Sequence, residues 1–336
     1  FMNIVHDRIN LEVFRGCTRG CRFCQAGMIY RPVRERSVSR LMELAEKLVE
    51  NTGYEEISLS SLSTSDYSQL EDLVKQMMER FQERKVSFSL PSLRIDSFAR
   101  EFIEEMRKVR KAGLTFAPEA GTQRLRDVIN KGVTEEDLLN SVTDAFELGW
   151  DSVKLYFMIG LPTETEDDLM GIAHLSKKVR ECYMRNNRES GSRRFKMTVS
   201  TSSFVPKPFT PFQWVPQDSI EKLHSKQQFL RDKLRIKSLT YNWHDPNLSF
   251  LEAVFARGDR RLGKVLLKAW ENGCRFDGWG EQFKYDAWMK AFSESGIEPS
   301  FYANRRRHKD EIFPWAHIDV GVTPLFLWNE YQRALK

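Results

Sequence analysis

Short β-rich segments alternate with amphipathic helical segments as far as Ser200, and no other feature of the sequence constrains its fold as strongly. The strand-like segments are Ile9–Phe14, Glu56–Leu59, Val86–Leu90, Leu114–Phe116, Ser152–Met158 and Lys196–Ser200. The segments with helical spacing of apolar residues are Ser39–Glu50, Gln69–Glu83, Glu101–Lys111, Glu135–Leu148 and Glu166–Cys182. Strands that alternate with helices build right-handed βαβ units and a parallel sheet. The sequence therefore predicts an α/β protein, although periodicity alone does not decide between an open sheet and a barrel.

Glycine and proline cluster directly after several of these strands. The clusters are Arg15-Gly16, Ala117–Gly121, Gly160–Pro162 and Val205-Pro206. In both architectures the loops at the carboxyl ends of the strands build the binding site. We therefore expect functional residues in these loops.

The character of the chain changes after Pro206. The stretch Pro206–Pro216 contains four prolines, and a charged helix is predicted over Ser219–Lys237. Six of the eight tryptophans follow Tyr241, and a terminal helix is predicted over Pro324–Leu335. We predict a first domain over residues 1–215, a connecting helix over 216–240 and a smaller α-rich domain for substrate recognition over 241–336.

The bulk properties exclude several classes of protein. Of the 336 residues, 41% are apolar and 29% charged, and the net charge is +5, as in a globular protein. No apolar run is long enough to span a bilayer, and the charged segment Phe1–Asn10 does not fit a secretory signal. We expect a cytoplasmic protein without a membrane partner. Because the chain begins at Phe1 and reaches a strand almost at once, it is compatible with being a fragment of a longer polypeptide.

Three of the five cysteines, Cys17, Cys21 and Cys24, form a CxxxCxxC motif just after the first predicted strand. This spacing is typical of metal binding in a reducing compartment and not of a disulfide framework. Three thiolates on one loop leave one iron of a [4Fe–4S] cubane without a protein ligand, and an open iron can bind a substrate or cofactor. The alternative is a structural zinc site, but zinc needs a fourth ligand, and the neighbouring sequence as far as Ser37 supplies no further Cys or His.

The motif, with the aromatic residue Phe23 before its last cysteine, resembles that of the radical S-adenosylmethionine (SAM) superfamily. Further segments are similar to radical SAM proteins that are often fused to a cobalamin-binding-type domain; these are Arg15–Met28, Ser60–Tyr67, Ala117–Gly121 and Gly160–Glu166. The resemblance extends from Asn10 to about Trp214, and the C-terminal region is similar to that group as well. The chain has no DxHxxG motif, so its sequence gives no support for cobalamin as a cofactor.

The resemblance implies an incomplete (β/α)6 barrel that carries a [4Fe–4S] cluster and SAM at the carboxyl ends of its strands. It also implies that SAM is cleaved reductively to a radical that abstracts hydrogen from a substrate. By the same resemblance Phe23 packs near the adenine, Ser60 and Ser61 stand beside the methionine amine, and Glu119 reaches the ribose or the amino acid part of SAM. The alternatives are loop or capping roles for the serines, and for Glu119 a carboxylate at the start of a helix beginning near Thr122.

Two further cofactor contacts are expected after the next strand. Lys154 is a cation within an apolar strand, placed to meet the SAM carboxylate, unless it pairs structurally with Glu119 or Asp151. Gly160 begins a loop that resembles the adenine-side loop of the family, where a residue without a side chain permits close approach. We interpret Glu164 and Glu166 in this loop as caps of the following helix.

The remaining features of the sequence indicate structural roles. Cys182 and Cys274 cannot furnish a second cluster with cysteine ligands alone, and we expect them to be buried or inert. Most of Trp243, Trp270, Trp279 and Trp288 are expected to fill the core of the C-terminal domain. The basic run Arg305–Lys309 is expected at the solvated surface. The alternative is that the run and the neighbouring aromatic residues bind RNA, but the nearly balanced charge of this region argues against that.

Three function classes follow from the sequence. The first, which the motifs favour, is a radical SAM enzyme that modifies a macromolecule or a metabolite, with RNA as one candidate substrate and flavodoxin or ferredoxin as the reductant. Methyl and methylthio transfer are among the reactions that share its opening step. The second class is a cluster-bearing, non-catalytic module that binds RNA or protein. The third is an interaction protein built around zinc.

Overall fold

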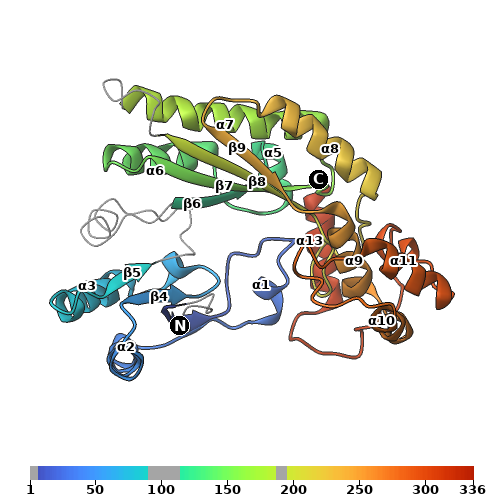
Figure 1. Cartoon of the computed structure of the whole chain (residues 1–336), viewed down its shortest axis with the longest axis horizontal. Coiled ribbons are helices and arrows are strands. Elements are labelled where there is room, and N and C mark those ends of the chain that lie inside the picture. The colour runs from blue at the N-terminus through green and yellow to red at the C-terminus, as the bar shows by residue number, and fades with distance from the viewer. Residues whose placement is uncertain (1–6, 90–113, 187–194) are drawn as a thin grey trace.

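The computed structural model describes residues 7–89, 114–186 and 195–336 (Figure 1). The elements before the first gap are β1 (Ile9–Glu12), β2 (Phe14–Arg15), α1 (Ala26–Ile29), β3 (Arg34–Glu35), α2 (Val38–Thr52), β4 (Glu56–Ser60), a 3-10 turn η1 (Thr64–Asp66), α3 (Leu70–Phe81) and β5 (Ser87–Ser89). Those between the gaps are β6 (Leu114–Glu119), α5 (Gln123–Val128), α6 (Glu135–Glu147), β7 (Ser152–Ile159) and α7 (Glu166–Asn186). Those that follow are β8 (Lys196–Ser203), α8 (Ile220–Lys233), β9 (Leu239–Trp243), α9 (Pro246–Arg257), α10 (Leu262–Glu271), α11 (Tyr285–Glu294), α12 (Ser300–Ala303) and α13 (Pro324–Ala334).

The strands form two parallel sheets, as the alternation predicts. One sheet has the order β1-β4-β5 and the other β6-β7-β8-β9, and a short antiparallel ladder joins β2 to β3. Each of the six predicted strand segments contains a strand. The segment Ile9–Phe14 is interrupted at Val13, where the chain passes from β1 to β2. The helix predicted over Glu101–Lys111 lies outside the described residues.

A seventh parallel strand, β9, was missed by the sequence reasoning. It pairs with β8 from Leu239 to Trp243, and so it crosses the predicted boundary at residue 240. Its side chains explain the miss, because none of the five is fully buried and no apolar run marks the strand. The predicted division of the chain into 1–215, 216–240 and 241–336 stays a prediction.

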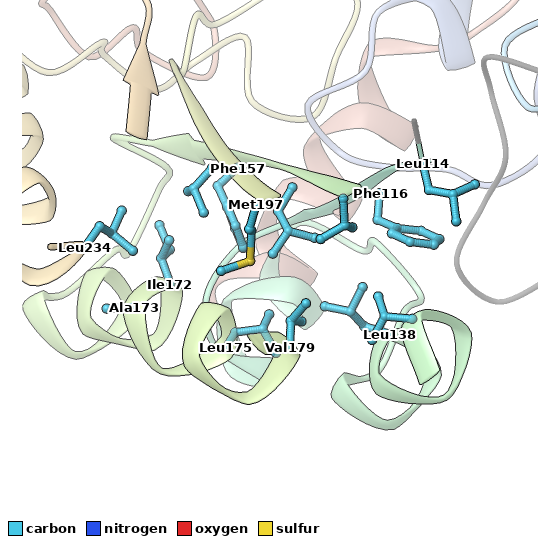
Figure 2. Close-up of a cluster of buried hydrophobic side chains, with 14 of the residues drawn as sticks. Leu114, Phe116, Leu138, Phe157, Ile172, Ala173, Leu175, Val179, Met197 and Leu234 are labelled. Carbon is cyan, nitrogen blue, oxygen red and sulfur yellow. The ribbon is translucent and has the colours of Figure 1, made fainter. Parts of the chain in front are cut away.

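Helices cover the outer face of each sheet (Figure 1). Side chains of β6, β7 and β8 pack against α6, α7 and α8, and Figure 2 shows Phe157 and Met197 on the strands facing Ile172 and Val179 on α7. A second cluster joins β1 and β4 to α2 and α3. Each βα unit thus buries its apolar residues on one side of its sheet.

The inner faces of β7 and β8 are polar and only partly buried. On β7 every second residue from Val153 to Ile159 is apolar and buried. The residues between them are Lys154, Tyr156 and Met158, and none of these three is fully buried. On β8 the corresponding positions are Thr198, Ser200 and Ser202. A parallel sheet covered by helices on both faces has nearly continuous apolar strands. The alternation here therefore indicates an inner face that is open to a ligand.

The C-terminal region is helical, and its last segment shares a core with the strand-end loops. This core combines Met28 of α1 and Leu125 of α5 with Trp315 and with Tyr331 of α13. A separate cluster holds α9, α10, α11 and α12 together. The last helix thus packs directly against the parts of the chain that carry the predicted site.

The tryptophan prediction is largely wrong. Trp288 is buried, whereas Trp243, Trp270 and Trp279 are 44%, 58% and 59% exposed. Trp243 lies on the edge strand β9, and Trp270 lies near the end of α10. Neither side chain faces the helical core.

Two glycines bring the loop after β6 into backbone contact with α7. A Cβ atom on Gly121 would overlap the carbonyl oxygen of Asp168 and the amide nitrogen of Ile172. A Cβ atom on Gly171 would lie 2.8 Å from the carbonyl carbon of Gly121. The buried carboxylate of Asp168 also accepts a hydrogen bond from the hydroxyl of Thr122. The loop that follows β6 is therefore fixed to α7.

We expect Gly121→Ala to lower the free energy of unfolding by about 1–3 kcal/mol, because backbone on both sides prevents the new methyl group from being accommodated. The control is Gly263→Ala in α10, where a Cβ atom meets nothing within 4 Å. That change should leave stability unchanged or raise it by roughly 0.5–1 kcal/mol. Urea denaturation measures both, and equal stabilities of the two variants would contradict the close contact.

Candidate functional site

The three cysteines lie on the loop between β2 and α1, at the carboxyl end of the first sheet. The amide of Val13 donates to the carbonyl oxygen of Ser60, so this loop begins beside the end of β4. Gly16 has φ +92°, and a Cβ atom there would lie 2.5 Å from the carbonyl oxygen of Tyr30. Only glycine therefore lets the chain enter the loop in this way. All three cysteine side chains are half-buried.

Two backbone amides, those of Gly27 and Ala26, point at the sulfur atom of Cys24. The amide of Gly27 donates to Cys24 Sγ at 3.4 Å. Burial raises the pKa of the Cys24 thiol, as does the neighbouring Cys17, while the amides of Gly27 and Ala26 and the charge of Lys131 act in the opposite direction. Amides that point at a cysteine sulfur favour its thiolate form, and the thiolate is the form that binds a metal.

Arg22, between the last two cysteines, anchors the loop to two other parts of the chain. Its guanidinium donates to the carbonyl oxygens of Asp127 and Val128 at 2.9 and 2.8 Å, at the end of α5, and it pairs with Glu330 of α13 at 3.3 Å. The backbone amide of Arg22 donates to the carbonyl oxygen of Ile129 at 2.9 Å. The cation thus binds carbonyl groups at the end of α5, of which that of Asp127 also accepts from the amide of Asn130.

Other contacts hold the loop at its two ends. Arg19 Nε donates to Asp66 in the turn after β4 at 2.8 Å. Gln25 Nε2 donates to the carbonyl oxygen of Pro208, after β8, at 3.2 Å. The loop is therefore fixed to segments that follow strands of both sheets.

The donor set fits a [4Fe–4S] cluster. Within residues 7–89, 114–186 and 195–336, no three His, Cys, Asp or Glu side chains converge as ligands of a single metal ion. Thiolates that bind different irons of a cubane stand farther apart than ligands of one ion, and three cysteines satisfy three of the four irons. The half-buried Cys24, whose sulfur accepts from backbone amides, has the surroundings expected of a cluster ligand.

Comparison with known proteins identifies the family. The family described as the Radical SAM superfamily matches residues 11–176. This chain belongs to the radical SAM superfamily. Membership implies a [4Fe–4S] cluster and SAM as cofactors, which confirms the prediction made from the cysteine motif and removes the reason for invoking zinc.

Several relatives are similar to this radical SAM protein. An uncharacterized protein of Methanocaldococcus jannaschii is 34% identical over 256 residues, which are 76% of this chain and 53% of that protein. A putative methylthiotransferase of the same organism is 25% identical over 48% of this chain and 37% of its own length. The anaerobic magnesium-protoporphyrin IX monomethyl ester cyclase of Cereibacter sphaeroides is 26% identical over 89% of this chain and 46% of its own length. The chain thus spans about half, or less, of the length of these relatives.

A solved structure is similar to part of the chain. The radical SAM methyltransferase of Kitasatospora setae, with cobalamin and a [4Fe–4S] cluster bound, has a TM-score of 0.49 and 15% sequence identity, over 61% of this chain and 38% of that chain. No helix within the described part of this radical SAM protein is long and apolar enough to cross a membrane.

The structure brings Glu119 close to the cysteine loop through Lys131. Lys131 Nζ pairs with Glu119 at 3.0 Å, and its charge also acts on Cys24. Glu119 ends β6 with φ +67°, and α5 begins after the cap Thr122, as expected. The sequence reasoning missed Lys131, which lies beyond α5 in a segment that matches no motif quoted for the family.

Phe23, Ser60 and Ser61 occupy the expected loops. Phe23 packs against the core that contains Met28 and Leu125. Ser60 is exposed at the end of β4, and Ser61 Oγ is 2.9 Å from Thr64 Oγ1. The hydroxyl of Ser61 therefore has a partner within its own turn, and the contacts of these residues with SAM stay predictions.

Lys154 lies on the open inner face of β7. Its ammonium group lies 4.4 Å from the ring centroid of Tyr156. Within the described residues it makes no ion pair, and Glu119, one of its proposed structural partners, pairs with Lys131 instead. The contact of Lys154 with the SAM carboxylate stays a prediction.

Gly160 and Glu164 form a structural corner. The Gly160 amide donates to the Glu164 carboxylate at 3.0 Å, and Lys226 of α8 pairs with Glu164 at 2.5 Å and with Asp218 at 2.6 Å. The interpretation of Glu164 as a helix cap is wrong, because Asp168 accepts from the amide of Thr165 at the start of α7. A Cβ atom on Gly160 would lie 3.3 Å from Asp218. Close packing against Asp218 therefore favours glycine at this position, in addition to the predicted cofactor contact.

Cys182 and Cys274 lie in different parts of the fold. Cys182 is half-buried and packs against the core of β6–β8 with α6 and α7, and Cys274 is buried in the C-terminal helical cluster. Burial raises the pKa of the Cys274 thiol. Cys274 is therefore buried as expected, whereas Cys182 is only half-buried.

Anaerobically purified protein should contain about four irons and four sulfides per chain. We expect Cys17→Ser, Cys21→Ser and Cys24→Ser each to abolish the cluster absorption, because each removes the ligand of one iron. Cys182→Ser is the matched control and should retain full iron and sulfide. A Cys24→Ser protein with wild-type iron content would contradict the ligand assignment.

Glu119→Gln and Lys154→Met should each weaken SAM binding by roughly 10- to 100-fold, the worth of one charge-assisted hydrogen bond, while iron content stays unchanged. Equilibrium dialysis with labelled SAM measures the affinity. Lys177→Met, at an exposed position of α7, controls for the loss of a positive charge. Unchanged affinity in both variants would remove Glu119 and Lys154 from the cofactor site.

Proposed function

We propose that this protein is a radical SAM enzyme that binds a [4Fe–4S] cluster through Cys17, Cys21 and Cys24, cleaves SAM reductively, and modifies a substrate bound between the strand ends and the C-terminal helical region. The observation that carries the proposal is the loop itself. Its three thiols lie at the carboxyl end of a parallel sheet, and the sulfur of Cys24 accepts from the amide of Gly27 and is acted on by the charge of Lys131. When bound, the cluster and SAM supply a radical that abstracts hydrogen from an unreactive carbon.

The fold supports an incomplete barrel as the scaffold of this chemistry. Both sheets are parallel and carry their helices on the outer face (Figure 1). The inner faces of β7 and β8 carry polar side chains. In a partial barrel these inner faces would surround the cofactor. Lys154 would then hold the carboxylate of SAM, and the pair Glu119–Lys131 would orient its ribose or amino acid part.

A non-catalytic RNA-binding module has less support. The run Arg305–Lys309 was expected at the surface, but Arg307 is only 4% exposed, and Arg305 pairs with Glu311 at 2.6 Å. Arg306 is exposed and donates to the hydroxyl of Tyr331 at 2.8 Å. These arginines have partners within the fold and are not all at the surface. The run therefore offers no row of unpaired arginines to the phosphate groups of RNA.

The proposal is tested by incubating the reconstituted protein with SAM and a strong reductant under anaerobic conditions. We expect 5′-deoxyadenosine or S-adenosylhomocysteine, identified by mass spectrometry, and none from Cys21→Ser. Cys182→Ser should behave as the wild type. If the wild type keeps its cluster and binds SAM but forms neither product, it is a binding module and not an enzyme. Flavodoxin or ferredoxin should replace the chemical reductant.

A further inference from the structure

A cavity of about 830 Å³ lies between the cysteine loop and the C-terminal helical region. One wall contains Gln25, which directly follows Cys24, and the others contain the loop between α9 and α10 and the segment before α13. Its volume is within the range of pockets that bind small organic molecules. The cavity therefore begins one residue from a predicted cluster ligand.

The body of the cavity is apolar and aromatic. Phe209 and Trp315 line it with ring centroids 6.5 Å apart in an edge-to-face arrangement, and Ile318 lies at its edge, half-exposed. Aromatic side chains of this kind hold flat or apolar ligands.

The rim of the cavity carries an available positive charge. Arg260 lines it and is exposed, and its guanidinium group makes no hydrogen bond or ion pair within the described residues. The carboxylate of Asp259 is already engaged, because Arg261 binds it at 2.7 Å and the hydroxyl of Tyr302 donates to it at 3.2 Å. Arg260 is thus free to bind an anion, and Asp259 is not free to bind a cation.

Buried arginines behind the cavity add to its positive potential. Arg307 is 4% exposed and stacks over the ring of Trp315 at 5.2 Å. Arg257 is fully buried and donates to backbone carbonyls, and burial together with the charges of Arg307 and Arg305 lowers its pKa to about 9. Glu311 pairs with Arg305 and Arg307, whereas Arg257 makes no ion pair within the described residues. A buried charge without a counterion is costly, and an anion in the cavity would offset that cost.

We propose that this cavity is the substrate site of the enzyme and that the substrate is a small organic anion, with an apolar or aromatic body and a carboxylate or phosphate group that Arg260 binds. Trp315 and Phe209 contact the body. This inference rests on the proposed function. A nucleic acid strand would need an extended row of cations, whereas the charges of residues 241–336 are nearly balanced, and so a small anion is favoured.

The probe is anilinonaphthalene sulfonate, an aromatic anion, and uncharged phenylnaphthylamine is its counterpart. Both are titrated by fluorescence into the full chain with its cluster. We expect Arg260→Gln to weaken binding of the sulfonate by about tenfold, the worth of one charge-assisted contact, and to leave the neutral dye unchanged. Ile318→Glu, which adds a negative charge at the edge of the cavity, should weaken the sulfonate as well. Arg231→Gln, at an exposed position of α8, should change neither dye.

Two results would overturn the anion site. One is sulfonate binding that is unchanged in Arg260→Gln but lost in Trp270→Ser, which would place the dye on the exposed face of α10. The other is displacement of the sulfonate by a single-stranded RNA oligonucleotide but not by benzoate or pyrophosphate, which would assign the site to RNA. The same preparation is assayed for SAM cleavage. If SAM is cleaved but Arg260→Gln does not change sulfonate binding, the anion site alone is overturned. If Arg260→Gln weakens sulfonate binding but SAM is not cleaved, the radical function alone is overturned.

Discussion

Arg22 joins three parts of the chain that meet only in the folded protein, and the position of the cysteine loop depends on it. Its guanidinium binds two carbonyl groups at the end of α5 and the carboxylate of Glu330 on α13, while the residue as a whole is 9% exposed. A buried cation is tolerated only when its donors are satisfied, and removing one partner of such a pair costs about 3–5 kcal/mol. The loop between Cys21 and Cys24 therefore has one stable position relative to the second sheet.

That position links stability to chemistry. The outer faces of the sheets bury the apolar side chains that hold the fold together, so the inner faces of β7 and β8 are free to carry lysine, serine and threonine. The close contact between Gly121 and α7 fixes the loop after β6, and with it Glu119 and Lys131 beside Cys24. Rigid loops at strand ends keep a cofactor in one orientation, which radical chemistry requires in order to act on one substrate atom.

What the sequence predicts well is local. The cysteine motif, the six strands and the helix starts depend on residues a few positions apart. The partners of Arg22 are far away in the sequence, and Lys131 belongs to no motif that would indicate its pairing with Glu119. Such contacts form only in the folded chain and could not be predicted from local sequence. Strand β9 was missed because Leu239 and Tyr241 are only partly buried. Arg307 looked like a surface residue, because nothing in a basic run shows that it will stack on Phe313 and Trp315.

The C-terminal region does more than follow the sheets. Met28 after the cysteines, Leu125 of α5 and Tyr331 of α13 belong to one core, so the segment that would select a substrate also supports the cysteine loop. Glu330, next to Tyr331, is the residue that pairs with Arg22. A ligand that displaces Trp315 would therefore act on the packing around α13, and through Glu330 and Arg22 on the loop between two cluster ligands. Because interactions that share a core are coupled, substrate binding and the geometry of the cysteine loop should influence each other in this fold.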